Sequence, residues 1–326
     1  MLKKLARKVL DVADNLCALA SPPGHARAGT LTTLLFHSIY RNREEISSPQ
    51  LAPHQDITVE DLQRCIGHIL DSGFTAVTPA QVDAGLDPAG KYVMITFDHG
   101  YYNNTRALDV LERFQTPATF FVSTDHVLEQ KGFWWDALHR ELSLAGASAG
   151  TRRRSMERAK SLSAAHIEAA LVRRHGRAVL RPRSDLDRPM TPAELKDFAA
   201  NRWVHIGNHT RNHAILTNCS VPEMKQQIEG CQQAMRELVG YAPLAIAYPN
   251  GDYSRDAIAV AEAAGLRIGF TVRPCKNRLP LVDGASRMEL GRFMPHGKLD
   301  MGAQWRKFNA AFVPSHRLKL LMTSPY

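Results

Sequence analysis

The chain has 326 residues, of which 44% are hydrophobic, and a formal net charge of +9. This length allows one large α/β domain or two small ones, while the composition excludes a disordered or fibrous chain and the lack of any run of about 18 apolar residues excludes a membrane-spanning helix. The five cysteines are odd in number and have no paired spacing, which indicates a reducing compartment.

Residues 1–28 are expected to form an amphipathic helix followed by a linker. Apolar and basic residues recur there at helical spacing, namely Leu2, Leu5, Val9, Val12 and Leu16 beside Lys3, Lys4, Arg7 and Lys8. The helix either docks on its own domain or lies on an anionic membrane surface. Asp11 and Asp14 interrupt the apolar stretch that a secretion signal needs. We therefore expect a cytoplasmic protein with peripheral contact at the inner face of the cell membrane.

Strands and helices alternate from residue 29 onward. Apolar runs predict strands, and stripes at helical spacing predict helices: strand Leu31–Phe36, a helix after Thr58 that ends at Gly73, strand Tyr92–Phe97, helix Leu108–Phe114 and strand Ala118–Val122. The series continues with a helix over residues 224–238, strand Leu244–Tyr248, helix Ala257–Ala264 and strand Arg267–Thr271. This alternation indicates a parallel α/β domain over residues 29–300, with a C-terminal tail at 301–326.

A basic segment at about residues 143–188 breaks this alternation and is interpreted as a helical insertion. Residues 151–190 contain ten arginines and Lys160 against four carboxylates. Two interpretations stay open: a solvated pair of basic helices, or a lid that attracts an acidic substrate. No aromatic residues alternate with the basic ones, so nucleic acid is not an expected partner.

Candidate catalytic residues follow the predicted strands. His37 ends the first strand, and Asp98 with His99 ends the strand before Gly100. His209 and His213 are four residues apart, so on a helical turn both imidazoles would face one metal ion. With 14 histidines in the chain this spacing alone is weak evidence, and two structural histidines are the alternative.

These residues resemble the motifs of the polysaccharide deacetylases of carbohydrate esterase family four. Residues 96–100 read TFDHG where the family has TFDDG, and residues 209–213 match its H(S/T)xxH motif. PATFFV at 117–122, FWWD at 133–136 and AYPNGDYS at 247–254 are also similar to the family. The resemblance spans Leu31–Phe293 and implies a distorted (β/α) barrel with seven strands.

The resemblance also implies roles. Asp98 would be the general base, and His209 and His213 would bind a divalent metal, with Zn²⁺ expected. His99 stands where the family has an acidic ligand, so it either completes a three-histidine site or does not reach the metal. In the second case the protein is a catalytically degenerate relative that binds carbohydrate.

Three further assignments follow from the resemblance. Leu35-Phe36-His37 is similar to an LxH motif whose histidine is the general acid, placed before TFDHG as in the circularly permuted subset of the family. Arg292, or else Arg287, would orient the catalytic aspartate. The YPNG turn would bind substrate through Tyr248, Pro249, Asn250 and Gly251.

The expected function is therefore that of a metal-dependent hydrolase that removes an N-acetyl or other N-acyl group from an amino sugar, in surface-glycan or lipopolysaccharide biosynthesis. The substrate would be a precursor linked to a nucleotide or a polyprenyl carrier, because phosphates would suit the basic insertion. A deformylase or an amidase acting on a lipid-linked or non-sugar substrate is the alternative, since it would use the same residues.

Overall fold

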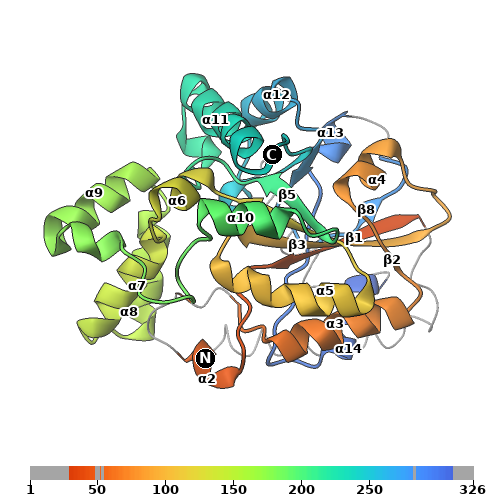
Figure 1. Ribbon diagram of the computed structural model, residues 1–326, viewed down its shortest axis with the longest axis horizontal. Coiled ribbons are helices and arrows are strands. Elements are labelled where there is room, and N and C mark those ends of the chain that lie inside the picture. Colours follow the sequence, from red (N-terminus) through yellow and green to blue (C-terminus); the bar gives the residue numbers. More distant parts are fainter. Residues whose placement is uncertain (1–28, 48–51, 53–54, 282–283, 311–326) are drawn as a thin grey trace, which may run out of the picture.

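The computed structural model describes residues 29–47, 52, 55–281 and 284–310, and Figure 1 shows a curled sheet surrounded by helices, with a group of helices projecting at one side. The N-terminal segment 1–28 and its predicted amphipathic helix lie outside the described residues, as do residues 311–326.

The central sheet contains the predicted strands. In the described part of the chain seven strands run in the order β7-β6-β5-β4-β3-β1-β8, and a short strand, β2, also pairs with β3. Their bounds are β1 Thr30–Phe36, β2 Thr75–Ala76, β3 Lys91–His99, β4 Ala118–Val122, β5 Val204–Asn208, β6 Ala245–Ala247, β7 Ile268–Phe270 and β8 Asn277–Arg278. Adjacent strands from β1 to β7 are parallel, and β8 is antiparallel to β1. The predicted seven-stranded α/β fold is confirmed.

An extended segment, Leu290–Phe293, joins the two ends of the curled sheet. Leu290 bridges to Phe270 of β7, and Phe293 bridges to Leu34 of β1. The segment accepts backbone hydrogen bonds at both ends of the sheet, from Thr271 N–H to the carbonyl of Leu290 and from Leu35 N–H to that of Phe293, each at 2.8 Å. The segment between the bridges therefore lies at the seam of a closed, distorted barrel.

Helices cover the outside of the barrel, and most begin where the sequence supplies a cap. In α3, the side chain of Thr58 accepts a hydrogen bond from Asp61 N–H while the Asp61 carboxylate accepts one from Thr58 N–H. The α-helices are α2 Arg43–Ile46, α3 Val59–Asp71, α4 Pro79–Ala84, α5 Leu108–Phe114, α6 Thr124–Glu129, α7 Trp134–Leu144, α8 Ala149–Ala159, α9 Ala164–His175, α10 Pro192–Ala199, α11 Val221–Val239, α12 Arg255–Ala263, α13 Gly284–Arg287 and α14 Met301–Asn309. Single 3₁₀ turns are η1 Tyr102–Ala107, η2 Arg177–Leu180, η3 Leu216–Asn218 and η4 Pro249–Gly251. Within the described ranges, no helix has both the length and the apolar character needed to cross a membrane.

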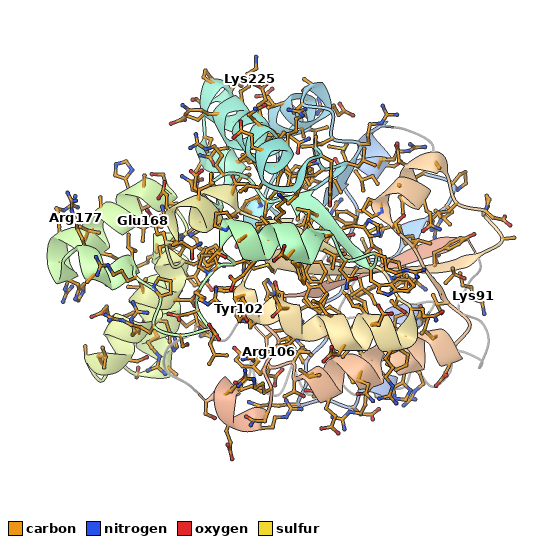
Figure 2. All side chains as sticks on the ribbon, in the orientation of Figure 1. Lys91, Tyr102, Arg106, Glu168, Arg177 and Lys225 are labelled. Carbon is orange, nitrogen blue, oxygen red and sulfur yellow. The ribbon has the colours of Figure 1, made fainter. Side chains whose placement is uncertain are left out.

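The basic insertion forms a helical subregion with a small core of its own. Helices α7, α8 and α9 pack over a cluster that includes Trp134, Ile167 and Leu171, separate from the main core beneath α3, α5 and α10. Many of its arginines face solvent, as Arg177 does at the outer edge of the subregion (Figure 2). Helices α8 and α9 occupy the segment interpreted as an insertion, and they stand beside the barrel.

The C-terminal tail predicted at 301–326 is wrong for its first residues. Met301–Asn309 form helix α14, and Trp305 packs edge-on against Phe74 with ring centroids 4.8 Å apart. Trp305 also donates its indole N–H to Ser72 Oγ at 3.1 Å. Met301, Trp305 and Phe308 belong to the main core, so the packed domain extends beyond residue 300.

Candidate active site

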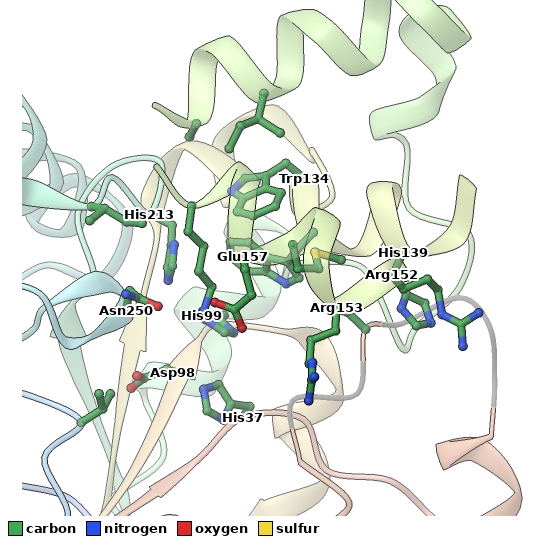
Figure 3. Close-up of a pocket in the computed structure, with 18 of the residues that line it drawn as sticks. His37, Asp98, His99, Trp134, His139, Arg152, Arg153, Glu157, His213 and Asn250 are labelled. Atoms are coloured by element: carbon green, nitrogen blue, oxygen red, sulfur yellow. The ribbon is translucent and has the colours of Figure 1, made fainter. Parts of the chain in front are cut away.

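A pocket of about 640 Å³ opens where the strands end. Its floor comes from the barrel and contains His37, Asp98, His99, His213 and Asn250; one wall comes from α7, α8 and α9 (Figure 3). The carboxyl ends of parallel strands meet at the same mouth, which is why residues so far apart in sequence share this pocket.

Asp98 and His99 both reach the pocket because the backbone turns sharply at the end of β3. Successive strand residues normally point to opposite faces of a sheet. Here His99 has a φ of 84° and Gly100 has one of 82°, both in the left-handed region. A Cβ on Gly100 would lie 2.8 Å from Val122 Cγ1, so glycine suits this turn in space as well as in conformation.

Asp98 is held by Arg292, the residue delivered by the closing segment Leu290–Phe293. The guanidinium donates to both carboxylate oxygens, Nη1 to Oδ1 at 2.7 Å and Nη2 to Oδ2 at 2.8 Å. Its Nε donates to the carbonyl of Thr271 at 2.9 Å, and this additional hydrogen bond fixes the plane of the guanidinium. Burial would raise the pKa of Asp98, but the adjacent Arg292 outweighs it and lowers that pKa, so Asp98 is ionised at neutral pH.

His209 and His213 lie on the loop that follows β5. The expectation of a helical turn is wrong: Thr210 and His213 have φ values of 60° and 57°, so the chain is not helical there. The side chain of Asn208 stabilises the loop, because its Oδ1 accepts from Thr210 N–H at 2.8 Å and its Nδ2 donates to the carbonyl of Ile228 at 3.0 Å. The loop still brings His213 to the pocket floor, with the ring of His209 4.7 Å from that of His213, centroid to centroid.

Three imidazoles converge at one point. Potential ligand atoms of His99, His209 and His213 all lie within 4.8 Å of one another. His209 Nδ1 lies 2.8 Å from the carbonyl of Ala247, which can only accept, so Nδ1 carries the proton and Nε2 keeps its lone pair. That Nε2 is buried with no hydrogen-bond partner among the described residues. Burial also lowers the pKa of His209, which keeps the ring neutral. These residues fit a divalent metal ion held by three histidines.

His37 faces the pocket with a defined tautomer. Gln55 donates its amide hydrogens to the carbonyls of Leu35 and Pro295, at 2.9 and 2.7 Å, so its Oε1 is the acceptor. This Oε1 accepts from the backbone N–H of His37 at 2.9 Å and lies 3.3 Å from His37 Nδ1. Nδ1 is therefore protonated, and Nε2 is the ring nitrogen that can exchange a proton. Burial lowers the pKa of His37 to about 4, so the resting ring is neutral.

An aromatic wall beside the histidines was not predicted as part of the site. The ring of Trp135 lies 4.9 Å from that of His99 and 4.6 Å from that of His213, centroid to centroid. Its indole N–H donates to Tyr101 Oη at 2.9 Å, and Tyr101 donates to Asp136 at 2.6 Å. The FWWD sequence was a signal for these residues, but it gave no indication that Trp135 packs on the imidazoles.

The YPNG residues differ in their surroundings. Asn250 lines the pocket. Tyr248 is fully buried and stacks on Tyr253 at 5.3 Å, so its side chain does not contribute to the pocket surface. Pro249 is buried, and Gly251 has a φ of 80° with Val272 too close for a Cβ. Of these four predicted substrate-binding residues, the geometry supports direct contact for Asn250. Arg287, the second candidate to orient Asp98, pairs with Asp83 instead.

The sequence is similar to that of known polysaccharide deacetylases. Residues 85–269 match the family model described as polysaccharide deacetylase. A Bacillus subtilis protein named as a polysaccharide deacetylase, YxkH, is 20% identical over 231 residues, which cover 69% of this chain and 59% of that protein. The chain thus spans little more than half the length of this curated relative.

Solved structures share the fold. The Streptococcus pyogenes deacetylase PplD, in complex with acetate, superposes with a TM-score of 0.59 at 16% identity, covering 86% of this chain and 98% of that one. A de-N-acetylase from Aggregatibacter actinomycetemcomitans gives a TM-score of 0.59 at 15% identity and covers 85% of this chain and 99% of that one. The distorted barrel of the deacetylase type is thereby confirmed.

Proposed function

The chain belongs to the polysaccharide deacetylase family, whose members are hydrolases of carbon–nitrogen bonds, and on that basis we propose that it is a metal-dependent hydrolase that removes an N-acyl group, typically acetyl, from an amino sugar. One observation carries the proposal: His37, Asp98, His99 and His213 line the same pocket, while Arg292 pairs with Asp98 and His209 completes the cluster of three imidazoles. Amide hydrolysis needs an activated water, a stabilised acyl oxygen and a proton for the leaving nitrogen, and this set has a group for each need.

The proton transfers are assigned to Asp98 and His37. Asp98 is ionised, and each carboxylate oxygen keeps a lone pair beside its hydrogen bond from Arg292, so it accepts a proton from the attacking water. His37 is neutral at rest and therefore takes up a proton from solvent at Nε2 during the reaction, and Asp98 returns the proton of the attacking water to solvent at the end of the cycle. It then donates this proton to the amine nitrogen as the carbon–nitrogen bond breaks, while Gln55 keeps the ring oriented.

The histidine cluster would hold the cofactor. His209 Nε2 is the ligand atom on its ring, with His99 and His213 completing the set, and we propose Zn²⁺ because neutral imidazoles suit it. When bound, the ion would polarise the acyl carbonyl and make water more acidic. The Ala247 carbonyl that fixes His209 and the Trp135 ring that packs on His99 and His213 keep the imidazoles in place.

Metal content measured by elemental mass spectrometry tests this assignment. We expect about one equivalent of zinc or a similar divalent ion per chain, loss of that metal and of amide hydrolysis in His209→Ala, and retention of both in His205→Ala. His205 is a matched control, because it lies on β5, the strand that leads into the loop of His209, and is absent from the cluster. No metal in the wild-type protein even after zinc is supplied would leave the carbohydrate-binding relative as the better account.

The substrate beyond this class is also a proposal. A formyl group, or an amide that is not on a sugar, would meet the same catalytic residues, so release of free amine from N-acetyl and N-formyl amino sugars must be compared. A precursor carried on a nucleotide or polyprenyl phosphate suits the basic insertion. Cytoplasmic location and contact with an anionic membrane stay predictions from residues 1–28.

A further inference from the structure

The wall of the pocket opposite the histidines has a charge that hydrolysis does not require. Arg152, Arg153 and Lys160 of the α8 region line it together with a single carboxylate, Glu157. In Figure 3 the side chains of Arg153 and Glu157 extend from α8 into the pocket, over the floor that holds His37 and His99. The wall is therefore cationic and faces the catalytic groups.

Several basic residues of the subregion are already held by acidic partners. Lys131 pairs with Glu168 at 3.0 Å, Arg140 with Asp187 at 3.3 Å and Arg188 with Glu194 at 2.7 Å. Within the described ranges, neither Arg153 nor Lys160 forms an ion pair or a side-chain hydrogen bond. Both are exposed, so their donors remain available to a ligand in the pocket.

The same wall is apolar beside the cations. Met156, Leu162 and Ile167 line the pocket, and Leu162 is 52% exposed although it is a large hydrophobic residue. Trp134 continues this surface from α7. The volume of about 640 Å³ lies within the range of roughly 300–1,000 Å³ that holds a drug-sized ligand, so there is room for more than the reacting acyl group.

We propose that α8 and α9 form a subsite for a phosphate ester that carries an apolar chain, with Arg153 and Lys160 binding the phosphate and Met156, Leu162 and Ile167 contacting the chain. This rests on the proposed function in one respect, namely that the ester is the carrier portion of the amino-sugar substrate. Guanidinium and ammonium groups are the usual partners of phosphate, and neighbouring apolar residues favour an alkyl chain over a nucleoside.

Binding of geranyl phosphate, followed by isothermal titration calorimetry, tests the subsite apart from catalysis. We expect Arg153→Ala/Lys160→Ala to weaken binding by about tenfold or more, because two charge-assisted contacts are lost. Arg154→Ala/Arg158→Ala removes the same charge from exposed positions of α8 outside the pocket and should change the affinity by less than about threefold. Equal effects of the two variants would overturn the proposal.

Further titrations, with a chelator or with other ligands, separate the contributions of metal, phosphate and alkyl chain to the affinity. Affinity that disappears with a chelator in the wild-type protein would show that a metal holds the phosphate, and would overturn the proposal. Uridine diphosphate binding as tightly as geranyl phosphate would overturn the apolar portion of the subsite. Geraniol should bind more weakly than geranyl phosphate, since it lacks the charge.

The two proposals can fail separately. If N-acetylated sugar is hydrolysed but geranyl phosphate does not bind, the subsite is wrong and the hydrolase stands. If geranyl phosphate binds in the expected variant-dependent way but no N-acylated sugar, free or linked to a polyprenyl phosphate, is hydrolysed, the subsite stands and the proposed function is wrong.

Discussion

The barrel mouth and the inserted helices contribute opposite sides of one pocket, and their charged side chains differ in burial and in pairing. At the mouth, Asp98 and Arg292 are buried and joined by two short hydrogen bonds, with side chains 5% and 0% exposed. On α8 and at the cap that follows it, Arg153 and Lys160 are exposed and without an acidic partner in the part of the chain that the structure describes. A buried pair constrains geometry, whereas exposed cations keep their donors for a ligand. The barrel mouth is therefore suited to holding reacting groups in a fixed geometry, and the inserted helices are suited to binding a ligand.

The largest expected effect concerns activity at the mouth. Asp98→Asn should lower kcat for amide hydrolysis by about 10²–10⁴-fold, because the amide cannot accept the proton from water. The metal content should persist, since Asp98 is not part of the histidine cluster. Asp109→Asn on the surface of α5 makes the same charge change away from the pocket and should leave kcat unchanged. An Asp98→Asn protein that keeps more than a tenth of the activity would exclude Asp98 as the base.

The next effect concerns stability. Arg292→Leu should lower the free energy of unfolding in urea by about 3–5 kcal/mol, because it leaves a buried carboxylate without its partner. It should also raise the pKa of Asp98, so activity would be lost at a higher pH as the solution is acidified. Arg287→Leu, which removes a half-buried pair to Asp83, should cost about 1 kcal/mol or less. Similar losses in both variants would show that the Asp98–Arg292 pair contributes no more to the free energy of unfolding than the Asp83–Arg287 pair does.

The smallest effect is expected on the inserted helices. Arg153→Ala/Lys160→Ala should change the free energy of unfolding by no more than about 0.5 kcal/mol, since both side chains are exposed and neither forms an ion pair with the described residues. Thermal and urea unfolding of this variant check the expectation. A loss comparable with that of Arg292→Leu would mean that these residues hold the helices together, and the contrast between the two regions would disappear.

Much of the fold follows from local pattern. Helix α5 and strand β4 have the predicted bounds, and α3 begins after Thr58 as its cap indicates. Helix α14 was missed because its apolar face becomes recognisable only when it packs on α3. The left-handed turns at Thr210 and His213 were also missed, since hydrogen bonds from Asn208 to the loop and to Ile228 of α11 stabilise that loop.

The site was predictable where residues occur in motifs and not where tertiary contacts create it. His37, Asp98 and the three metal-binding candidates stand in recognisable sequences, and the fold brings them together. Gln55 lies in a polar stretch with no local signal, yet it sets the tautomer of His37. Likewise, the charge of the insertion was visible in the sequence, but the selection of Arg153 rather than Arg154 depends on the direction in which α8 faces.

The seam formed by Leu290–Phe293 has a consequence for biosynthesis. Arg292 follows Asp98 by 194 residues, so a nascent chain on the ribosome has completed β3 long before the guanidinium exists. Until translation passes that point, the Asp98 carboxylate lacks its Arg292 partner, and the sheet lacks the segment that joins β1 to β7. We therefore expect competence for catalysis to be acquired late in translation, and a polypeptide released before the seam is made should be inactive.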